Sequence, residues 1–171
     1  MELFNRFKQI RAFIFALDGV CVDGGVWVGE GGIRYRRADS RDCYALRVAV
    51  ANDYPIAIVG EGAGGDMGIL LERIGINDMF FNVDDKSVAL RDWMAGRGLE
   101  VEQVLCMGCE VSDLHSMEVA GFATCPVDAV EDVKELSTYI SHYRGGAGAV
   151  RDVIEKVMKL QGVWGEKRIK R

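Results

Sequence analysis

Side chains that could do chemistry follow several short apolar runs of this chain. Asp18 comes after the apolar residues 12–17, and it either exchanges protons as a general acid or base or only caps the next turn. Lys86 either binds an anion or pairs with neighbouring carboxylates. Cys109 is either a reactive thiol near a helix start or a small filler behind a strand. The segments that follow the apolar runs, and in which we expect functional residues, are 16–18, 60–62, 86 and 108–113.

Two further clusters are typical of anion binding, and each also has a purely structural interpretation. A glycine-rich stretch could cradle a phosphate through its backbone N–H groups. Its glycines stand at positions 60, 62, 64 and 65. This spacing matches neither Gly-x-Gly-x-x-Gly nor a P-loop, so we interpret the stretch as a flexible loop. A group of arginines forms either an anion-facing patch or a solvated face, and its members are Arg34, Arg36, Arg37 and Arg41.

Apolar runs that alternate with amphipathic segments predict a parallel sheet covered by helices on both faces. Strands are expected over 12–17, 55–59, 79–83, 104–107, 122–125 and 139–141, and helices over 42–52, 66–74, 86–97, 113–120, 130–136 and 147–161. Asp42 is the expected N-cap of the first of these helices. Residues 26–28 and 33–35 flank a glycine-rich turn and predict a β-hairpin. The fold class is therefore a doubly wound α/β sheet with an inserted hairpin, and ligands are expected at the carboxyl ends of its strands.

Composition and charge exclude several classes of protein. The chain has 171 residues and a net charge of −5, so wholesale electrostatic binding to nucleic acid is not expected. No stretch resembles a membrane span or a signal peptide, which predicts a cytoplasmic protein without membrane contact. The five cysteines are odd in number, and the single Cys106-Met-Gly-Cys109 spacing has no second pair. We therefore expect reduced thiols rather than disulfides or a zinc site.

A series of motifs occurs in a fixed order along the whole chain. They are Ala16-Leu17-Asp18-Gly19-Val20, Val22-Asp23-Gly24, Arg41-Asp42-Cys43-Tyr44, Asp85-Lys86, Met107-Gly108-Cys109-Glu110 with Asp113, Cys125-Pro126-Val127-Asp128, and Gly145-Gly146-Ala147-Gly148. Together they resemble the haloacid dehalogenase-like (HAD) superfamily and, within it, the 3-deoxy-D-manno-octulosonate 8-phosphate phosphatases. The resemblance implies one HAD-like domain over residues 1–171 with no separate cap domain. It places the hairpin at about 20–36 and the C-terminal helix and tail at about 147–171.

The same resemblance implies phosphatase chemistry, and this chain departs from its pattern at several positions. Where the family has an aspartate that attacks phosphorus, the chain has Ala16, whereas Asp18 keeps the acid/base position. Gly60 replaces a phosphate-binding Thr or Ser, and the negative charge of Glu61 beside it would disfavour a phosphate dianion. Lys86, which neutralises phosphate in the family, is retained. The resemblance also puts Arg41 and Asp42 near the substrate.

The metal-binding motif of the family is altered as well. Family members bind Mg²⁺, which prefers hard oxygen ligands. Here Cys109 replaces one acidic ligand, and a thiol is a poor ligand for magnesium. The remaining metal candidates are Asp18, Glu110 and Asp113, for which we expect weak magnesium binding or none.

Two function classes follow from these departures. In the first, the chain is a catalytically impaired or inactive homologue of a sugar-phosphate phosphatase that acts as a ligand-binding or regulatory oligomer. In the second, it remains an active phosphomonoester hydrolase that uses Asp18, Lys86, Glu110 and Asp113. The resemblance also predicts a homotetramer and an anionic ligand similar to a sugar phosphate. Trp27 of the hairpin and Trp164 of the tail are the expected subunit contacts.

Overall fold

The computed structural model describes residues 2–61 and 64–165. Its elements are α1 (Glu2–Gln9), β1 (Ala12–Ala16), β2 (Trp27–Val28), β3 (Arg34–Tyr35), α2 (Ser40–Ala51), β4 (Ile56–Gly60), α3 (Gly65–Ile74), β5 (Asp78–Phe81), α4 (Lys86–Ala95), β6 (Val104–Met107), α5 (Leu114–Met117), β7 (Phe122–Cys125), α6 (Glu131–Leu136), β8 (Tyr139–Ile140) and α7 (Ala149–Leu160). Short 3₁₀ turns cover Glu30–Gly32, Val101–Gln103 and Val111–Asp113.

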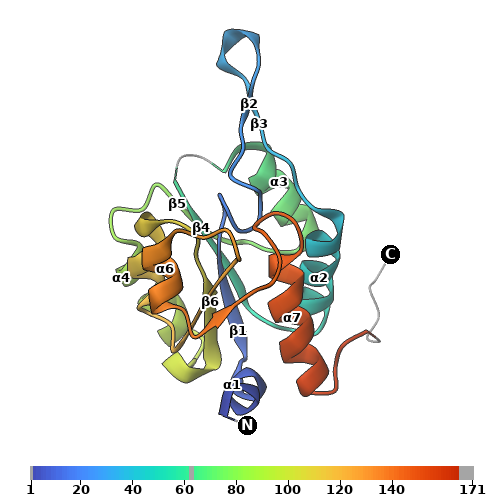
Figure 1. Ribbon diagram of the computed structural model, residues 1–171, viewed down its shortest axis with the longest axis vertical. Coiled ribbons are helices and arrows are strands. Elements are labelled where there is room, and N and C mark those ends of the chain that lie inside the picture. Colours follow the sequence, from blue (N-terminus) through green and yellow to red (C-terminus); the bar gives the residue numbers. More distant parts are fainter. Residues whose placement is uncertain (1, 62–63, 166–171) are drawn as a thin grey trace.

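The centre of the molecule is a six-stranded sheet in the order β5-β4-β1-β6-β7-β8. Every pair of neighbouring strands is parallel. Helices α2, α3 and α7 lie on one side of the sheet, and α4 and α6 lie on the other (Figure 1). The predicted parallel α/β fold is therefore confirmed. Among the described residues, no helix is long and apolar enough to cross a membrane.

Strand β1 forms the middle of the core because all five of its residues are buried. It pairs with β4 on one side and with β6 on the other, in a register that brings Ala16 beside Val59 and Phe15 beside Met107. The carboxyl ends of these three strands therefore meet at one edge of the sheet. This register places the segments singled out in the sequence next to one another.

Several predicted boundaries are wrong, and each has a local cause. Helix α2 begins at Ser40 because the side chain of Asp39, not that of Asp42, caps it by accepting hydrogen bonds from the N–H groups of Arg41 and Asp42. Strand β5 ends at Phe81 because the next residue, Asn82, has a left-handed φ of 53°.

The ends of the chain also differ from the sequence analysis. Helix α7 begins at Ala149, after Gly148 with a φ of 114°. Helix α1 was not predicted at all. It packs near α7, and the ring of its Phe7 meets the Phe122 ring edge-on at 4.7 Å between centroids.

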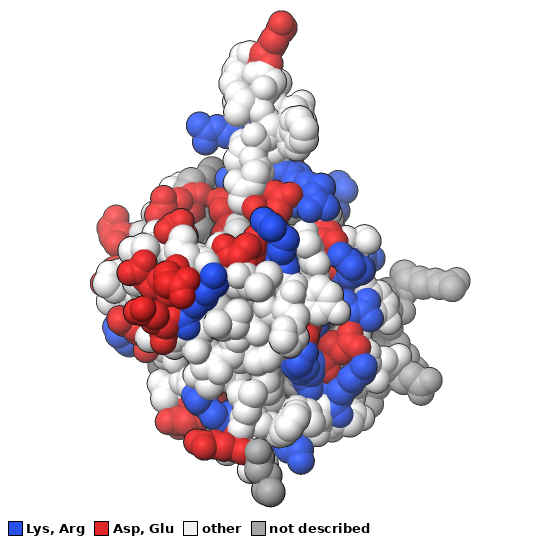
Figure 2. Space-filling model, in the orientation of Figure 1, with Lys and Arg blue, Asp and Glu red and all other residues white. Residues whose placement is uncertain are grey.

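The predicted hairpin is present and projects from the carboxyl edge of the sheet (Figure 1). Strands β2 and β3 are antiparallel, with Trp27 opposite Tyr35 and Val28 opposite Arg34. Much of its surface carries no charge (Figure 2). The Trp27 side chain is 75% exposed, and Val28 and Tyr35 are exposed as well. Because exposed apolar side chains gather here, the hairpin is the part of the molecule best suited to contact another surface.

Candidate functional site

A small cavity, the inner pocket, lies where β1, β4 and β6 end, and it has a volume of about 150 Å³. Most of the site residues predicted from the sequence line it, namely Ala16, Asp18, Gly60, Glu61, Lys86, Glu110 and Asp113. The parallel strands thus bring together segments that lie almost one hundred residues apart in the sequence. Among these lining residues, the side chain at the end of β1 is a methyl group, because that position holds Ala16.

Asp18 is held by an arginine from the hairpin. The Nε of Arg36 donates to Oδ1 of Asp18 at 2.7 Å, and Nη2 of Arg36 donates to Oδ2 at 3.2 Å. Such a paired geometry matches the fork of a guanidinium to the two oxygens of a carboxylate. Both oxygens of Asp18 therefore accept a hydrogen bond from Arg36, and the guanidinium balances the charge of this carboxylate.

Lys86 is also matched by a charge within the chain. It is the first residue of α4, and the side chain of Asp85 caps that helix by accepting from the N–H groups of Ser87 and Val88. The Nζ of Lys86 lies 3.7 Å from Oε1 of Glu61. An anion that reached Lys86 would therefore meet the Glu61 carboxylate, which repels it.

A phenyl ring occupies the space beside Gly60. A Cβ atom built at Gly60 would lie 2.9 Å from a ring carbon of Phe81 and 3.2 Å from Cβ of Leu17. A Cβ at Gly64 would lie only 2.5 Å from the same ring. The glycines at 60 and 64 thus accommodate the Phe81 ring, whereas position 62 of the glycine-rich stretch lies outside the described residues. A threonine at position 60 fits only if Phe81 moves.

The residues that follow β6 are hydrogen-bonded to one another. Oδ2 of Asp113 accepts hydrogen bonds from the N–H groups of Cys109 at 2.9 Å and Glu110 at 3.0 Å, and Oε1 of Glu110 accepts from the N–H of Val111 at 2.8 Å. Burial raises the pKa of Asp113, while those two N–H groups and the Lys86 charge oppose the shift. The two carboxylates therefore serve first to cap the turn that follows β6.

Cys109 is a filler rather than a reactive thiol. Burial, followed by the nearby carboxylates of Asp128, Asp113 and Glu110, raises its pKa to about 11. Its Sγ packs over Gly19, where an added Cβ would lie 2.7 Å away. A raised pKa keeps the thiol protonated at neutral pH, which disfavours a role as a nucleophile.

The donor set does not fit a magnesium ion. Asp18 is paired with Arg36, Glu110 and Asp113 bond to backbone N–H groups, and Ala16 supplies no oxygen. Within residues 2–61 and 64–165, no three side chains of His, Cys, Asp or Glu form a group that could hold a metal ion. Magnesium needs several oxygen ligands in near-octahedral geometry, which this arrangement does not offer.

The structure does not bring Arg41 and Asp42 to the inner pocket. Asp42 is 2% exposed, and its carboxylate accepts hydrogen bonds from the N–H groups of Gly148 at 3.0 Å and Arg151 at 2.8 Å. Burial raises its pKa to about 6, although these two hydrogen bonds act in the opposite direction. Arg41 lines a separate cavity with Tyr143 and residues of α7. Asp42 therefore joins α2 to the start of α7.

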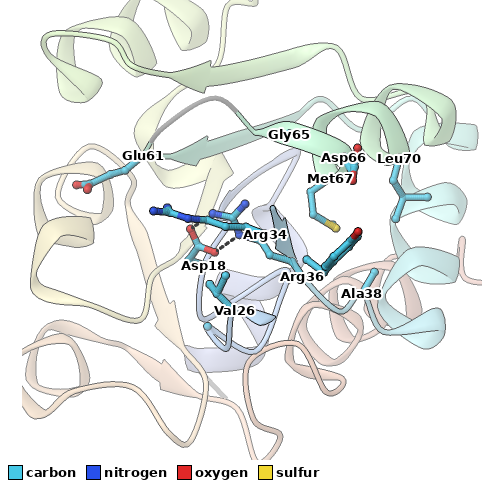
Figure 3. A pocket seen from close by; sticks show the side chains of 12 residues that line it. Asp18, Val26, Arg34, Arg36, Ala38, Glu61, Gly65, Asp66, Met67 and Leu70 are labelled. Atoms are coloured by element: carbon cyan, nitrogen blue, oxygen red, sulfur yellow. Dashed lines mark hydrogen bonds and ion pairs between the residues drawn. The ribbon is translucent and has the colours of Figure 1, made fainter. Parts of the chain in front are cut away.

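A second and larger cavity, the outer pocket, lies between the hairpin and α3 and has a volume of about 770 Å³ (Figure 3). It shares Asp18 and Glu61 with the inner pocket. Arg34 and Arg36 extend into it from the hairpin, and Met67 and Leu70 of α3 form part of its wall (Figure 3). The Asp18–Arg36 ion pair thus stands at the boundary between the two pockets.

Sequence reasoning missed two residues that decide the character of the inner pocket. Arg36 was seen only as a member of a basic cluster, although the hairpin returns it to the strand ends. Phe81 was hidden because the strand was expected to run to residue 83, so that Phe81 did not count as a strand-end residue. A prediction that ended this strand at Asn82, a residue type that tolerates a left-handed φ, would have found it.

Comparisons with known proteins identify the class of this fold. No family model matches the chain. The crystal structure of 3-deoxy-D-manno-octulosonate 8-phosphate phosphatase from Yersinia pestis superposes with a TM-score of 0.89 at 27% identity, covering 94% of this chain and 87% of that one. The phosphatase from Moraxella catarrhalis, solved with a magnesium ion, a phosphate ion and a KDO molecule, gives a TM-score of 0.88 at 26% identity, covering 94% and 92%. The chain therefore has the fold of the HAD-superfamily phosphatases.

Sequence similarity narrows the relationship further. The chain is 29% identical over 171 residues to the Yersinia pestis phosphatase KdsC, covering 96% of this chain and 90% of that protein. It is 27% identical over 164 residues to KdsC from Escherichia coli K12, covering 94% and 86%. The chain is thus a homologue of the 3-deoxy-D-manno-octulosonate 8-phosphate phosphatases, which confirms the resemblance seen in the sequence.

Proposed function

We propose that this chain is a homologue of the sugar-phosphate phosphatases that no longer hydrolyses phosphate esters and acts instead as a ligand-binding or regulatory oligomer. The observation that carries the proposal is the inner pocket. Its strand-end nucleophile position holds a methyl group, Ala16, and its Asp18 carboxylate is tied to Arg36. Catalytic residues that assist a nucleophile contribute little to the reaction rate once the nucleophile is absent.

The surroundings of Ala16 support the same proposal. Glu61 faces Lys86, and the Phe81 ring lies where a hydroxyl-bearing side chain at position 60 would need room. The two retained charged residues are each paired with another side chain of the same chain, Asp18 with Arg36 and Lys86 with Glu61.

The exposed hairpin supports assembly into an oligomer, for which we propose a homotetramer like that implied by the family. Trp27, Val28 and Tyr35 are 75%, 70% and 54% exposed, so they leave apolar surface available to another subunit. Trp164 of the tail has a different position, because its ring packs edge-on against Tyr44 at 6.2 Å between centroids, within the chain. The cysteines are all free, which supports action in a reducing compartment such as the cytoplasm.

A phosphatase assay tests the proposed loss of catalysis. The protein is incubated with Mg²⁺ and either 4-nitrophenyl phosphate or 3-deoxy-D-manno-octulosonate 8-phosphate, with the Escherichia coli relative as a positive control. We expect no release above the rate of an Asp18→Asn variant. Turnover above about 1 per second, at the lower end of ordinary enzymes, would favour the active phosphomonoester hydrolase instead.

Light scattering tests the proposed assembly. The wild-type chain is expected to run as a tetramer at micromolar concentration, and Trp27→Glu is expected to shift it toward smaller species, because a charge replaces exposed apolar surface. Glu30→Gln at the hairpin tip is the matched control and should leave the mass unchanged. A wild-type monomer would refute the tetramer without bearing on the loss of catalysis.

A further inference from the structure

An uncharged surface covers the edge of the sheet at β8, between α6 and α7 (Figure 2). Within the described part of the chain, β8 pairs only with β7, so its outer side is open. Four apolar side chains gather there and are 37% to 49% exposed, namely Val127, Leu136, Ile140 and Tyr143. These four residues are called the edge face. Exposed apolar side chains on an open sheet edge are typical of a surface that binds protein.

The two helices beside the edge face carry opposite charges. On α6, three of the six residues are acidic, and Asp132 and Glu135 are exposed without an ion-pair partner among the described residues. On α7, the carboxylate of Glu155 pairs with both Arg151 and Lys159, which leaves a surplus of positive charge. Acidic side chains therefore gather over α6, and lysine and arginine side chains lie over α7 (Figure 2).

This distribution of charge is self-complementary about one direction of two-fold axis. Helices α6 and α7 lie on opposite sides of the sheet (Figure 1). An axis that runs along β8 therefore places α6 of one copy opposite α7 of a second copy, and the free carboxylates meet the positive charge around Lys159. An axis perpendicular to the sheet would instead place α6 opposite α6, where like charges repel.

We propose that two copies of this chain associate through their edge faces, about a two-fold axis along β8, with α6 of each copy against α7 of the other. The apolar residues of the edge face then lie next to the axis, where each copy covers those of its partner. This contact is separate from the hairpin, and the two contacts together suffice for a tetramer with two-fold axes. The inference goes beyond the proposed function, because it depends neither on the hairpin contact nor on the loss of catalysis.

Light scattering of a hairpin variant tests this proposal. Trp27→Glu weakens the hairpin contact, so the species that remains at micromolar concentration should be a dimer. Adding Ile140→Glu, which places a charge within the edge face, should convert this dimer to a monomer. Adding Val88→Glu instead, at an exposed residue of α4, is the matched control and should leave the dimer. A monomer for Trp27→Glu alone, or a mass that Ile140→Glu does not lower, would overturn the proposal.

Exchange of charges tests the pairing of α6 with α7. In the Trp27→Glu background, Glu135→Lys and Lys159→Glu should each raise the dimer Kd at least about tenfold, because each contact occurs twice about a two-fold axis. The variant with both changes should return to within about threefold of the parent Kd, because the charges are again opposite. Glu72→Lys on α3 is the control and should change the Kd less than about twofold. Sedimentation equilibrium measures these constants, and no recovery in the combined variant would overturn the pairing.

These outcomes are distinguishable from failure of the proposed function. A wild-type dimer that Ile140→Glu converts to a monomer would refute the homotetramer and support the edge-face contact. Hydrolysis of 4-nitrophenyl phosphate with Mg²⁺ would refute the loss of catalysis without bearing on the edge face. Thermal melts of each variant show that a change in mass does not come from unfolding.

Discussion

The inner and outer pockets share Asp18 and Glu61 but use their charges in opposite ways. In the inner pocket the acidic and basic side chains pair with one another or with backbone N–H groups, and the volume is about 150 Å³. The outer pocket is about 770 Å³, and it retains an arginine, Arg34, without a partner among the described residues. Charged side chains that pair with one another have less to offer a ligand, even where the same residue types are present.

The largest expected effect is a return of chemistry to the inner pocket. Ala16→Asp, Gly60→Thr and Cys109→Asp restore the groups that the resemblance implies, and Phe81→Ala makes the room that a threonine at position 60 requires. The variant with all four substitutions should hydrolyse 4-nitrophenyl phosphate with Mg²⁺ at least about 100-fold faster than wild type. The restored groups depend on one another, so their combined effect exceeds the sum of the single changes. The assay follows nitrophenol release.

The variant that keeps Phe81 is the control for this experiment. With Gly60→Thr but without Phe81→Ala, the threonine meets the ring, so stability should fall and activity should stay at the wild-type level. Ala16→Asp alone should also be inert and less stable, because it sets a second carboxylate near Asp18. Activity from that single variant would show that the inner pocket is not closed by its own contacts.

The pH dependence of the free energy of unfolding should come from buried carboxylates such as Asp42 and not from the exposed Asp66 of the outer pocket. Asp42 titrates near pH 6 in the folded chain and near its ordinary 3.8 when unfolded. Between these values the folded state binds more protons, so the free energy of unfolding should fall as the pH rises from about 4 to 7. The loss amounts to at most about 3 kcal/mol.

Urea unfolding at a series of pH values measures this slope. Asp42→Asn should flatten it, although the raised pKa of Asp113 leaves a smaller slope of the same sign. Asp66→Asn, which changes an exposed carboxylate of the outer pocket, should leave the slope as in wild type. An unchanged slope in Asp42→Asn would show that burial of this carboxylate does not govern the pH dependence.

The smallest expected effect comes from the ion pair at the boundary of the two pockets. Arg36→Met should lower the free energy of unfolding by about 1 kcal/mol or less, because the Asp18 side chain is 42% exposed and solvent screens the pair. Arg37→Met, which breaks the more exposed pair with Asp23, should cost less. Equal losses in urea unfolding would mean that bonding to both oxygens of Asp18 adds nothing over the bonds of Arg37 to a single oxygen of Asp23.

Much of the fold could be predicted from the pattern of residues. Continuous apolar runs such as residues 12–17 and 104–107 predict strands buried on both faces, and the alternation with helices predicts parallel pairing. The predicted hairpin is also confirmed. The boundaries at Asp42 and Phe81 were missed because a cap one turn earlier and a left-handed Asn82 are local choices that compete with the apolar pattern.

The loss of the family's chemical groups was determined by the sequence alone. Ala16 cannot attack phosphorus in any fold, and a thiol at Cys109 cannot replace a carboxylate as a hard ligand. These statements depend on which atoms a side chain contains. No tertiary contact can add an oxygen to an alanine.

Only the tertiary structure decided what the remaining residues do. Asp18 and Arg36 are eighteen residues apart, and whether they meet depends on how the hairpin returns to the sheet. Phe81 closes over Gly60 because β4 and β5 pair in a register that sets these two residues side by side. Asp42 was expected to be an N-cap, but it is buried and accepts hydrogen bonds from the start of α7 because α7 packs on α2. Such pairings depend on distances across the fold, which residue types and spacing along the chain do not contain.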